Sequence, residues 1–103
     1  MIESLLNEVV RRIVDIADPK KIVLFGSHAR GNSHAHSDID LLVIMESQEP
    51  RYRRSAPLYG ALSNLLTPMD ILVYRPNEVE EWKNVPQAFV TTVLREGKTL
   101  YEK

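Results

Sequence analysis

The sequence predicts an α/β (α+β) fold with two layers, one a mixed sheet of three or four strands and the other the helices packed on it. Helical and strand-like patterns alternate along the chain, which favours helices packed on one sheet. Three short apolar runs have the length and the β-branched composition of buried strands. The 103 residues can enclose one modest core, so we expect residues 1–103 to form a single domain.

The first predicted element is an amphipathic helix over residues 2–17. Its apolar side chains recur at steps of three and four, at Ile2, Leu5, Leu6, Val9, Val10, Ile13, Ile16 and Ala17. Asp18 precedes a proline and therefore avoids the helical region, which ends the helix. Residues 21–25 then predict a buried strand. Gly26 and Ser27 end this strand, and a short helical turn follows through residues 28–30.

The strongest strand pattern covers residues 38–45, where two acidic residues lead into a continuous apolar run. A polar loop, residues 31–37, comes before it. Residues 51–66 predict a helix that Pro57 and Gly60 kink or split. The candidate inner residues of that helix are Tyr52, Leu58, Leu62, Leu65 and Leu66.

The remaining elements are a third strand, two helices and a short edge strand. We expect the strand over residues 69–74 and a helix over residues 76–85. Pro86 opens the last helix, and Gly97 ends it in the usual C-terminal position. Residues 99–101 form the edge strand.

Composition and charge exclude several classes of function. Thirteen basic and fourteen acidic residues give a net charge of -1, so general nucleic-acid binding is not expected. The absence of cysteine excludes thiolate metal sites and cysteine nucleophiles. The apolar runs are too short to span a bilayer, and charged residues in the first turns are unlike a signal peptide. We therefore expect a cytoplasmic protein with no membrane partner.

Three acidic residues are the candidate catalytic and metal-binding residues. Asp38 and Asp40 share one face of the predicted strand, roughly 6–7 Å apart. Asp70 begins the next strand and would lie about 5 Å away if the two strands are neighbours. Like charges about 4 Å apart repel by ~1–4 kcal/mol, so a cation must compensate them or a pKa must rise. Oxygen ligands favour Mg²⁺ or Mn²⁺, and two such ions serve phosphoryl and nucleotidyl transfer.

Gly26, Ser27 and Arg30 are the candidate nucleotide-binding residues. Glycine lets a phosphate approach the backbone, and the serine hydroxyl and neighbouring N–H groups can bind that phosphate. Arg30 can add a charge-assisted contact. Because Gly26 and Ser27 end one strand and Asp38 begins the next, we expect both groups at the same end of the sheet.

These motifs resemble the signature of the DNA polymerase beta nucleotidyltransferase superfamily. Gly26-Ser27 is followed after ten residues by Asp38-Ile39-Asp40. With the opening helix, Asp70 and the C-terminal segment Glu96-Gly97-Lys98-Thr99-Leu100-Tyr101-Glu102, the whole chain resembles the stand-alone minimal nucleotidyltransferase (MNT) group. The implied fold is a polymerase-beta-like nucleotidyltransferase palm.

The resemblance implies roles for the individual residues. In the family, the serine binds the phosphates of a nucleoside triphosphate, the two acids of the D-x-D motif hold both metal ions, and a third strand acid is general base and ligand. Carried over, these are Ser27, Asp38 and Asp40, and Asp70. Many MNT proteins are antitoxins paired with a helical HEPN ribonuclease toxin, which some silence by adding AMP to a tyrosine. The implied activity is therefore Mg²⁺-dependent AMP transfer from ATP to a protein hydroxyl. Asn32 departs from the pattern, since many members carry an acid there.

Other interpretations of the chain stay open. The chain could neutralise a HEPN toxin by binding alone, or act on a small molecule with a partner subunit. His28, His34 and His36 could hold a transition metal, lie over a bound nucleotide, or be solvated. The cluster Arg51, Arg53 and Arg54 could be a solvated basic face, or could contact a triphosphate or an acidic partner surface.

Overall fold

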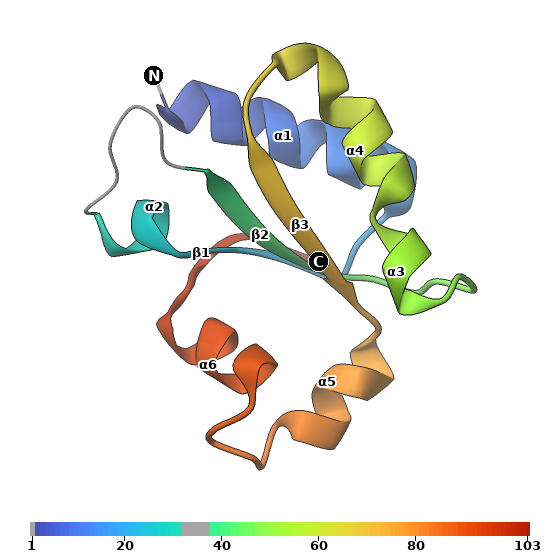
Figure 1. The fold of residues 1–103 in the computed structure, drawn as a ribbon, viewed down its shortest axis with the longest axis vertical. Helices are drawn as coiled ribbons and strands as arrows, with labels where there is room; N and C mark the ends of the chain where they lie inside the picture. Colours follow the sequence, from blue (N-terminus) through green and yellow to red (C-terminus); the bar gives the residue numbers. More distant parts are fainter. Residues whose placement is uncertain (1, 32–37) are drawn as a thin grey trace.

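The computed structural model describes residues 2–31 and 38–103. In this part of the chain, helices pack on both sides of a four-stranded sheet (Figure 1). The elements, in chain order, are α1 (Ile2–Ala17), β1 (Lys21–Phe25), α2 (Ser27–Arg30), β2 (Ile39–Ile44), α3 (Arg51–Arg54), α4 (Ala56–Leu62), the 3-10 helix η1 (Ser63–Leu65), β3 (Met69–Tyr74), α5 (Pro76–Trp82), α6 (Phe89–Glu96) and β4 (Lys98–Glu102). The expected mixed sheet is confirmed. Within the described ranges, no helix is both long and apolar enough to cross a membrane.

The sheet has the order β3-β2-β1-β4. β1 pairs with β2 and with β4 in antiparallel orientation, whereas β2 and β3 run parallel. The parallel pair aligns Asp40 with Asp70, and the antiparallel pair aligns Phe25 with Asp40. The start of β2, the start of β3 and the end of β1 therefore meet at one end of the sheet.

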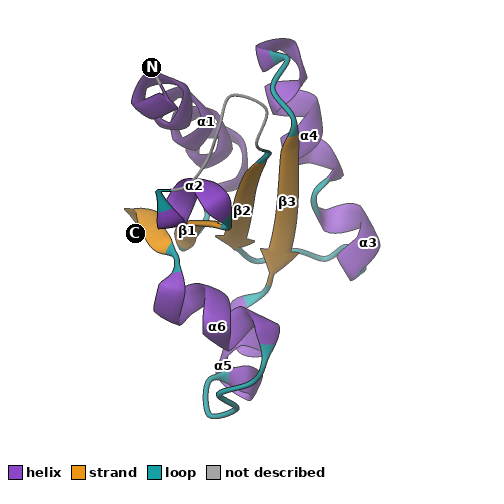
Figure 2. Cartoon of the chain, turned by 60° about the vertical axis from the view of Figure 1, so that its left-hand side comes forward, coloured by secondary structure: helices purple, strands orange, loops and turns teal. Residues whose placement is uncertain are grey.

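Helices cover both faces of the sheet (Figures 1 and 2). On one face α1 and α4 pack over the larger core, which comprises Leu6, Val9, Ile13, Ile22, Leu24, Ile39, Leu41, Val43, Leu58, Leu62, Ile71 and Val73. On the other face α6 packs over a second core of Val23, Leu42, Ile44, Val90 and Val93. With helices on both faces of the sheet, the fold has three layers, so the prediction of two layers was wrong. Strand residues alternate between faces, so strands that are apolar at nearly every position need cover on both sides.

The segment 51–66 is split, as predicted, but at Ser55 rather than at Pro57 or Gly60. Pro57 lies in the first turn of α4, where its missing N–H costs nothing. Leu58 and Leu62 are buried as expected. Tyr52 and Leu66 are not inner residues, because they are 82% and 88% exposed. Tyr52 lies on the short helix α3, which has a different orientation from α4 in Figure 1.

The two C-terminal helices are shorter than predicted, and α6 begins at Phe89 rather than at Pro86. Gly97 follows α6, but with φ -79° and ψ 172° it is extended rather than left-handed. A glycine is needed there for space, because a Cβ on Gly97 would lie 2.6 Å from Val23 Cγ1 and 2.8 Å from the Leu24 carbonyl oxygen. The edge strand β4 is confirmed.

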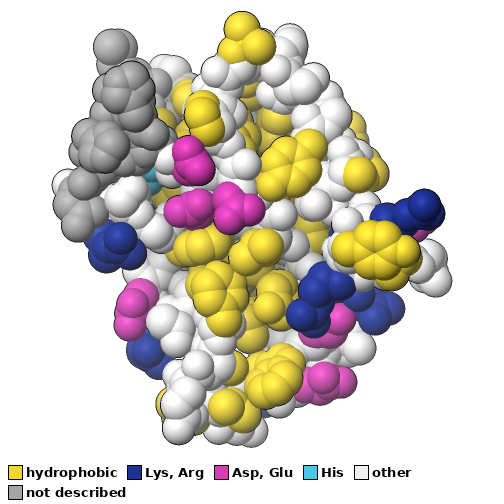
Figure 3. Space-filling view, viewed as in Figure 1, with side chains coloured by type: hydrophobic (Ala, Val, Ile, Leu, Met, Phe, Trp, Pro, Cys, Tyr) yellow, Lys and Arg dark blue, Asp and Glu magenta, His cyan; other side chains and the backbone are white. Residues whose placement is uncertain are grey.

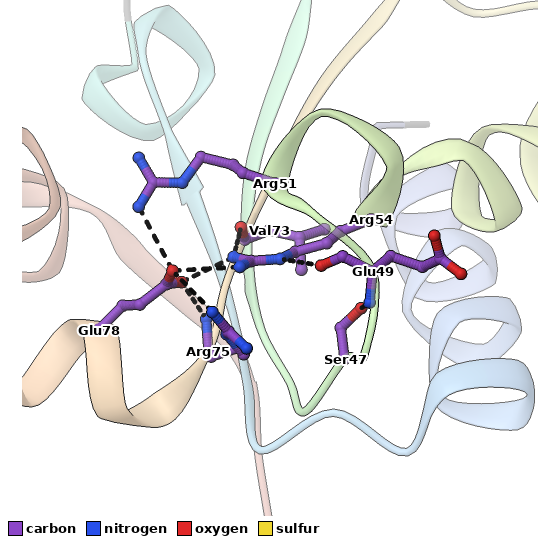
Figure 4. Close-up of polar contacts among 7 residues, drawn as sticks. All are labelled: Ser47, Glu49, Arg51, Arg54, Val73, Arg75 and Glu78. Carbon is purple, nitrogen blue, oxygen red and sulfur yellow. Dashed lines mark hydrogen bonds and ion pairs between the residues drawn. The ribbon is translucent and has the colours of Figure 1, made fainter.

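A buried ion pair fixes α5 to α3 and to the end of β3 (Figure 4). Arg54 is 4% exposed and donates to Glu78 Oε1 at 2.7 Å, to Glu78 Oε2 at 3.1 Å and to the Glu49 carbonyl at 3.0 Å. Glu78 also accepts from the backbone N–H of Arg75 at 2.8 Å. These contacts, with the charge of Arg51, lower the pKa of Glu78 to about 2. The solvated basic face is thus wrong for Arg54, although Arg51 and Arg53 are exposed.

Glu78→Gln should destabilise the protein by about 3 kcal/mol at pH 7, because it leaves the buried Arg54 without its counter-charge. Glu80→Gln on the same helix is the matched control, since its pair with Lys83 is exposed and should change stability by less than about 0.5 kcal/mol. Denaturant unfolding measures both values. A loss no larger for Glu78→Gln than for Glu80→Gln would contradict this assignment.

The same pair predicts a dependence on pH. The folded pKa of Glu78 lies below its usual value of 4.5, so its stabilising contribution is complete above that pH. The contribution is lost as the pH falls from 4.5 towards 2. The difference between the parent and Glu78→Gln should therefore shrink over that range, as unfolding measured at each pH would show.

Candidate active site

Asp40 and Asp70 occupy matching positions on the parallel strands β2 and β3. Neighbouring strands lie about 4.8 Å apart, so the two backbones hold these carboxylates side by side. Because side chains alternate along a strand, Asp40 shares its face with Leu42, and Asp70 shares its face with Leu72. Both leucines contribute to the second core, so both acids lie on the face that α6 covers further along.

Asp38 completes an acidic patch one residue before β2 begins. The pKa of Asp40 is raised, first by burial and then by the negative charges of Asp70 and Asp38. The neighbouring His28 and Arg30 act in the opposite direction on that pKa. Figure 3 shows acidic side chains gathered in one patch directly above an apolar area of the surface. The three predicted acids are therefore close enough to affect one another.

Gly26 brings the turn after β1 into direct contact with Asp40. A Cβ placed on Gly26 would overlap the Oδ2 atom of Asp40, so only glycine fits against this carboxylate. Gly26 also has φ 77° and ψ -156°, a conformation that is essentially restricted to glycine. Its carbonyl accepts from the N–H groups of Ala29 at 3.1 Å and Arg30 at 3.2 Å, which starts the turn α2. Both sequence motifs thus meet at the same end of the sheet.

Ser27 and Arg30 lie at the two ends of α2. Ser27 follows Gly26 directly and is half-buried, whereas Arg30 is exposed. The charge of Arg30 offsets part of the rise in the pKa of Asp40. The guanidinium of Arg30 therefore lies near the acidic patch. Asn32, His34 and His36 lie outside the described residues. All six predicted site residues are therefore described and lie at or beside the shared end of β1, β2 and β3.

The carboxylates fit a hard divalent cation. Within residues 2–31 and 38–103, no three His, Asp or Glu side chains form a ready metal-binding group. Mg²⁺, however, typically takes one or two protein carboxylates and completes its shell with water and substrate phosphates. The adjacent pair Asp40 and Asp70, with Asp38 nearby, matches that requirement. Their mutual repulsion is what a bound cation would relieve.

Sequence reasoning missed two aromatic contacts to residues that neighbour the acids, one to Ile71 and one to Phe25. Tyr59 accepts a hydrogen bond from the backbone N–H of Ile71, the residue after Asp70, at 2.8 Å. Phe89 packs edge-to-face on Phe25, with ring centroids 5.6 Å apart. The position of Phe25 immediately before Gly26 was the available signal that an aromatic ring borders this site.

Comparison with known proteins agrees with this geometry. The family described as Polymerase beta, Nucleotidyltransferase matches residues 7–103. A protein of Methanocaldococcus jannaschii that is named, provisionally, a protein adenylyltransferase is 33% identical over 84 residues. The alignment covers 80% of this chain and 78% of that protein.

Solved structures share the fold. One match is a chain of a toxin–antitoxin crystal structure with AMP-PNP, with a TM-score of 0.65 and 24% identity, covering 95% of this chain and 73% of that one. Another is a chain of the complex between tri-AMPylated Shewanella oneidensis HEPN toxin and MNT antitoxin, with a TM-score of 0.62 and 20% identity, covering 100% and 74%. At these identities the matches show a shared fold. With the family match over nearly its whole length, this chain belongs to the polymerase beta family of nucleotidyltransferases.

Proposed function

We propose that this chain transfers AMP from ATP to a tyrosine hydroxyl of a HEPN toxin and thereby acts as its antitoxin. The observation that carries the proposal is the alignment of Asp40 with Asp70 on adjacent parallel strands, with Gly26 packed against Asp40. This arrangement joins the two halves of a nucleotidyl-transfer site, a carboxylate pair and a turn suited to phosphate. Residues 1–103 would act as one catalytic domain.

The comparisons support the choice of nucleotide and acceptor. The M. jannaschii relative is named for AMP transfer to protein. The solved structures that share the fold include a toxin–antitoxin with AMP-PNP and a tri-AMPylated HEPN toxin with its MNT antitoxin. ATP as substrate and a HEPN toxin as partner are the simplest extension to this chain.

Each site residue has a role in this proposal. Asp38, Asp40 and Asp70 would hold two Mg²⁺ ions, which when bound supply positive charge to the reacting phosphate and its leaving group. Gly26 lets the phosphate chain approach the backbone, Ser27 donates its hydroxyl, and Arg30 adds a charge-assisted contact.

The acceptor protein would approach the acidic patch from the side of Asp70. Asp70 is exposed and lies on the edge strand β3, where a hydroxyl of another protein can reach it. Asp70 accepts the proton of that hydroxyl while the hydroxyl oxygen bonds to the α-phosphorus of ATP. The bond from the α-phosphorus to the bridging oxygen breaks, and pyrophosphate leaves. Positioning and electrostatics supply most of the rate.

Incubation with ATP, Mg²⁺ and the protein encoded by the neighbouring gene should add AMP to a tyrosine of that protein, detected by mass spectrometry. Asp40→Asn should lower the rate by about 100-fold or more, as expected for loss of a charge-stabilising group. Asp15→Asn is the matched control, because Asp15 is exposed on α1. A partner that is silenced equally well by Asp40→Asn without modification would replace this proposal with neutralisation by binding alone.

Asp40→Asn should also make the metal-free protein more stable at neutral pH, because it removes a half-buried charge that Asp38 and Asp70 repel. Mg²⁺ should raise the Tm of the parent by preferential binding to the folded state, and should raise that of Asp40→Asn much less. Calorimetry with EDTA and with Mg²⁺ measures both effects. No Mg²⁺ response in the parent would count against the metal assignment.

Gly26→Ala should abolish nucleotidyl transfer, since the new methyl group displaces the Asp40 carboxylate and strains the turn. The backbone strain alone should cost about 1–3 kcal/mol of folding stability. Gly60→Ala is the matched control, because Gly60 lies in α4 and, apart from the nearby backbone of that helix and its chain neighbours, no described atom lies within 4 Å of its added Cβ. That control should be stabilised by about 0.5–1 kcal/mol and remain active. Equal activity of the two variants would show that the turn does not need glycine.

A further inference from the structure

Phe89 is a half-exposed aromatic residue whose position the core does not explain. It begins α6 and is 48% exposed, whereas Val90 and Val93 of the same helix are buried in the second core. Its recorded ring contact is with Phe25, at an interplanar angle of 83°. One side of the Phe89 ring therefore remains available to a ligand.

The contact with Phe25 connects Phe89 to the acidic patch. Phe25 is the register partner of Asp40 and directly precedes Gly26. A phosphate chain bound at the turn of Gly26 and Ser27 would thus lie only one aromatic ring away from Phe89. In Figure 3 an apolar area of the surface lies directly below the acidic patch.

Two hollows flank Phe89, and it is the residue that their linings share. The first has a volume of about 180 Å³ and is lined also by Phe25, Gly26 and Arg30. The second has a volume of about 250 Å³ and is lined also by Tyr74 and Trp82. Arg51 lies over the Tyr74 ring, 4.7 Å from its centroid, so each hollow combines aromatic walls with a guanidinium.

We propose that Phe89 provides the stacking surface for the base of the bound nucleoside triphosphate. This inference rests on the proposed function, because it requires the phosphates to be held at Gly26 and Ser27. From that anchor the nucleoside can enter either hollow, and in both it meets Phe89. A nucleobase is flat and has a π face, so it covers the exposed ring without requiring a hydrogen-bond partner.

Calorimetric binding of ATP and of inorganic tripolyphosphate, each with Mg²⁺, tests the inference. Phe89→Leu keeps an apolar contact with Phe25 but lacks an aromatic face, and should weaken ATP binding by about 5- to 150-fold. Tripolyphosphate should bind this variant as it binds the parent, because it has no base. Phe89→Tyr should retain ATP binding, and Tyr52→Ala serves as a control at an exposed aromatic residue that lines neither hollow.

The outcomes separate this inference from the proposed function. Unchanged ATP binding by Phe89→Leu, with a parent that binds ATP, would overturn the stacking role and leave the proposed function intact. Equal weakening of ATP and tripolyphosphate would show a general disturbance of the site and also overturn the stacking role. A parent that binds neither ligand would overturn the proposed function itself.

Discussion

The contact between Gly26 and the Asp40 carboxylate is the constraint on which the candidate site depends. It requires a glycine in a conformation that other residues avoid, and it holds an acid against the turn after β1. The parallel register of β2 and β3 then places Asp70 beside that acid. Burial, and after it the repulsion from Asp70 and Asp38, raises the pKa of Asp40. The fold therefore keeps an unfavourable charge cluster in place, as expected where a cationic ligand provides the compensation.

The edge strand β3 carries Asp70, and side chains from the neighbouring helices fix it at both ends. Tyr59 of α4 accepts from the N–H of Ile71, next to Asp70. Near the other end, Arg54 of α3 donates to the Val73 carbonyl at 3.4 Å and pairs with Glu78. These contacts occupy polar groups of an edge strand, which limits pairing with other chains. They also fix the position of Asp70 relative to Asp40.

Periodicity was a good guide to the elements but a poor guide to their neighbours. The bounds of α1, β1 and β3 agree with the predictions because their apolar patterns are strong and their ends are marked by proline or glycine. Proximity of Asp40 and Asp70 was predicted only on the condition that their strands pair. The continuous apolar run of β2 was a signal for cover on the second face, since a strand that is apolar on both sides must be buried on both. The burial of Arg54 could not be predicted, because arginine is rarely buried and its partner Glu78 is distant in sequence. The contact of Phe89 with Phe25 is likewise a tertiary contact that the sequence pattern does not reveal.

A crystal structure with Mg²⁺ and a non-hydrolysable ATP analogue tests the central claim most directly. The account predicts Mg²⁺ bound to carboxylate oxygens of Asp38, Asp40 and Asp70 at about 2.0–2.1 Å, with the phosphates against Gly26 and Ser27. A nucleotide bound elsewhere, or a metal site in which Asp70 faces away from Asp40, would contradict it.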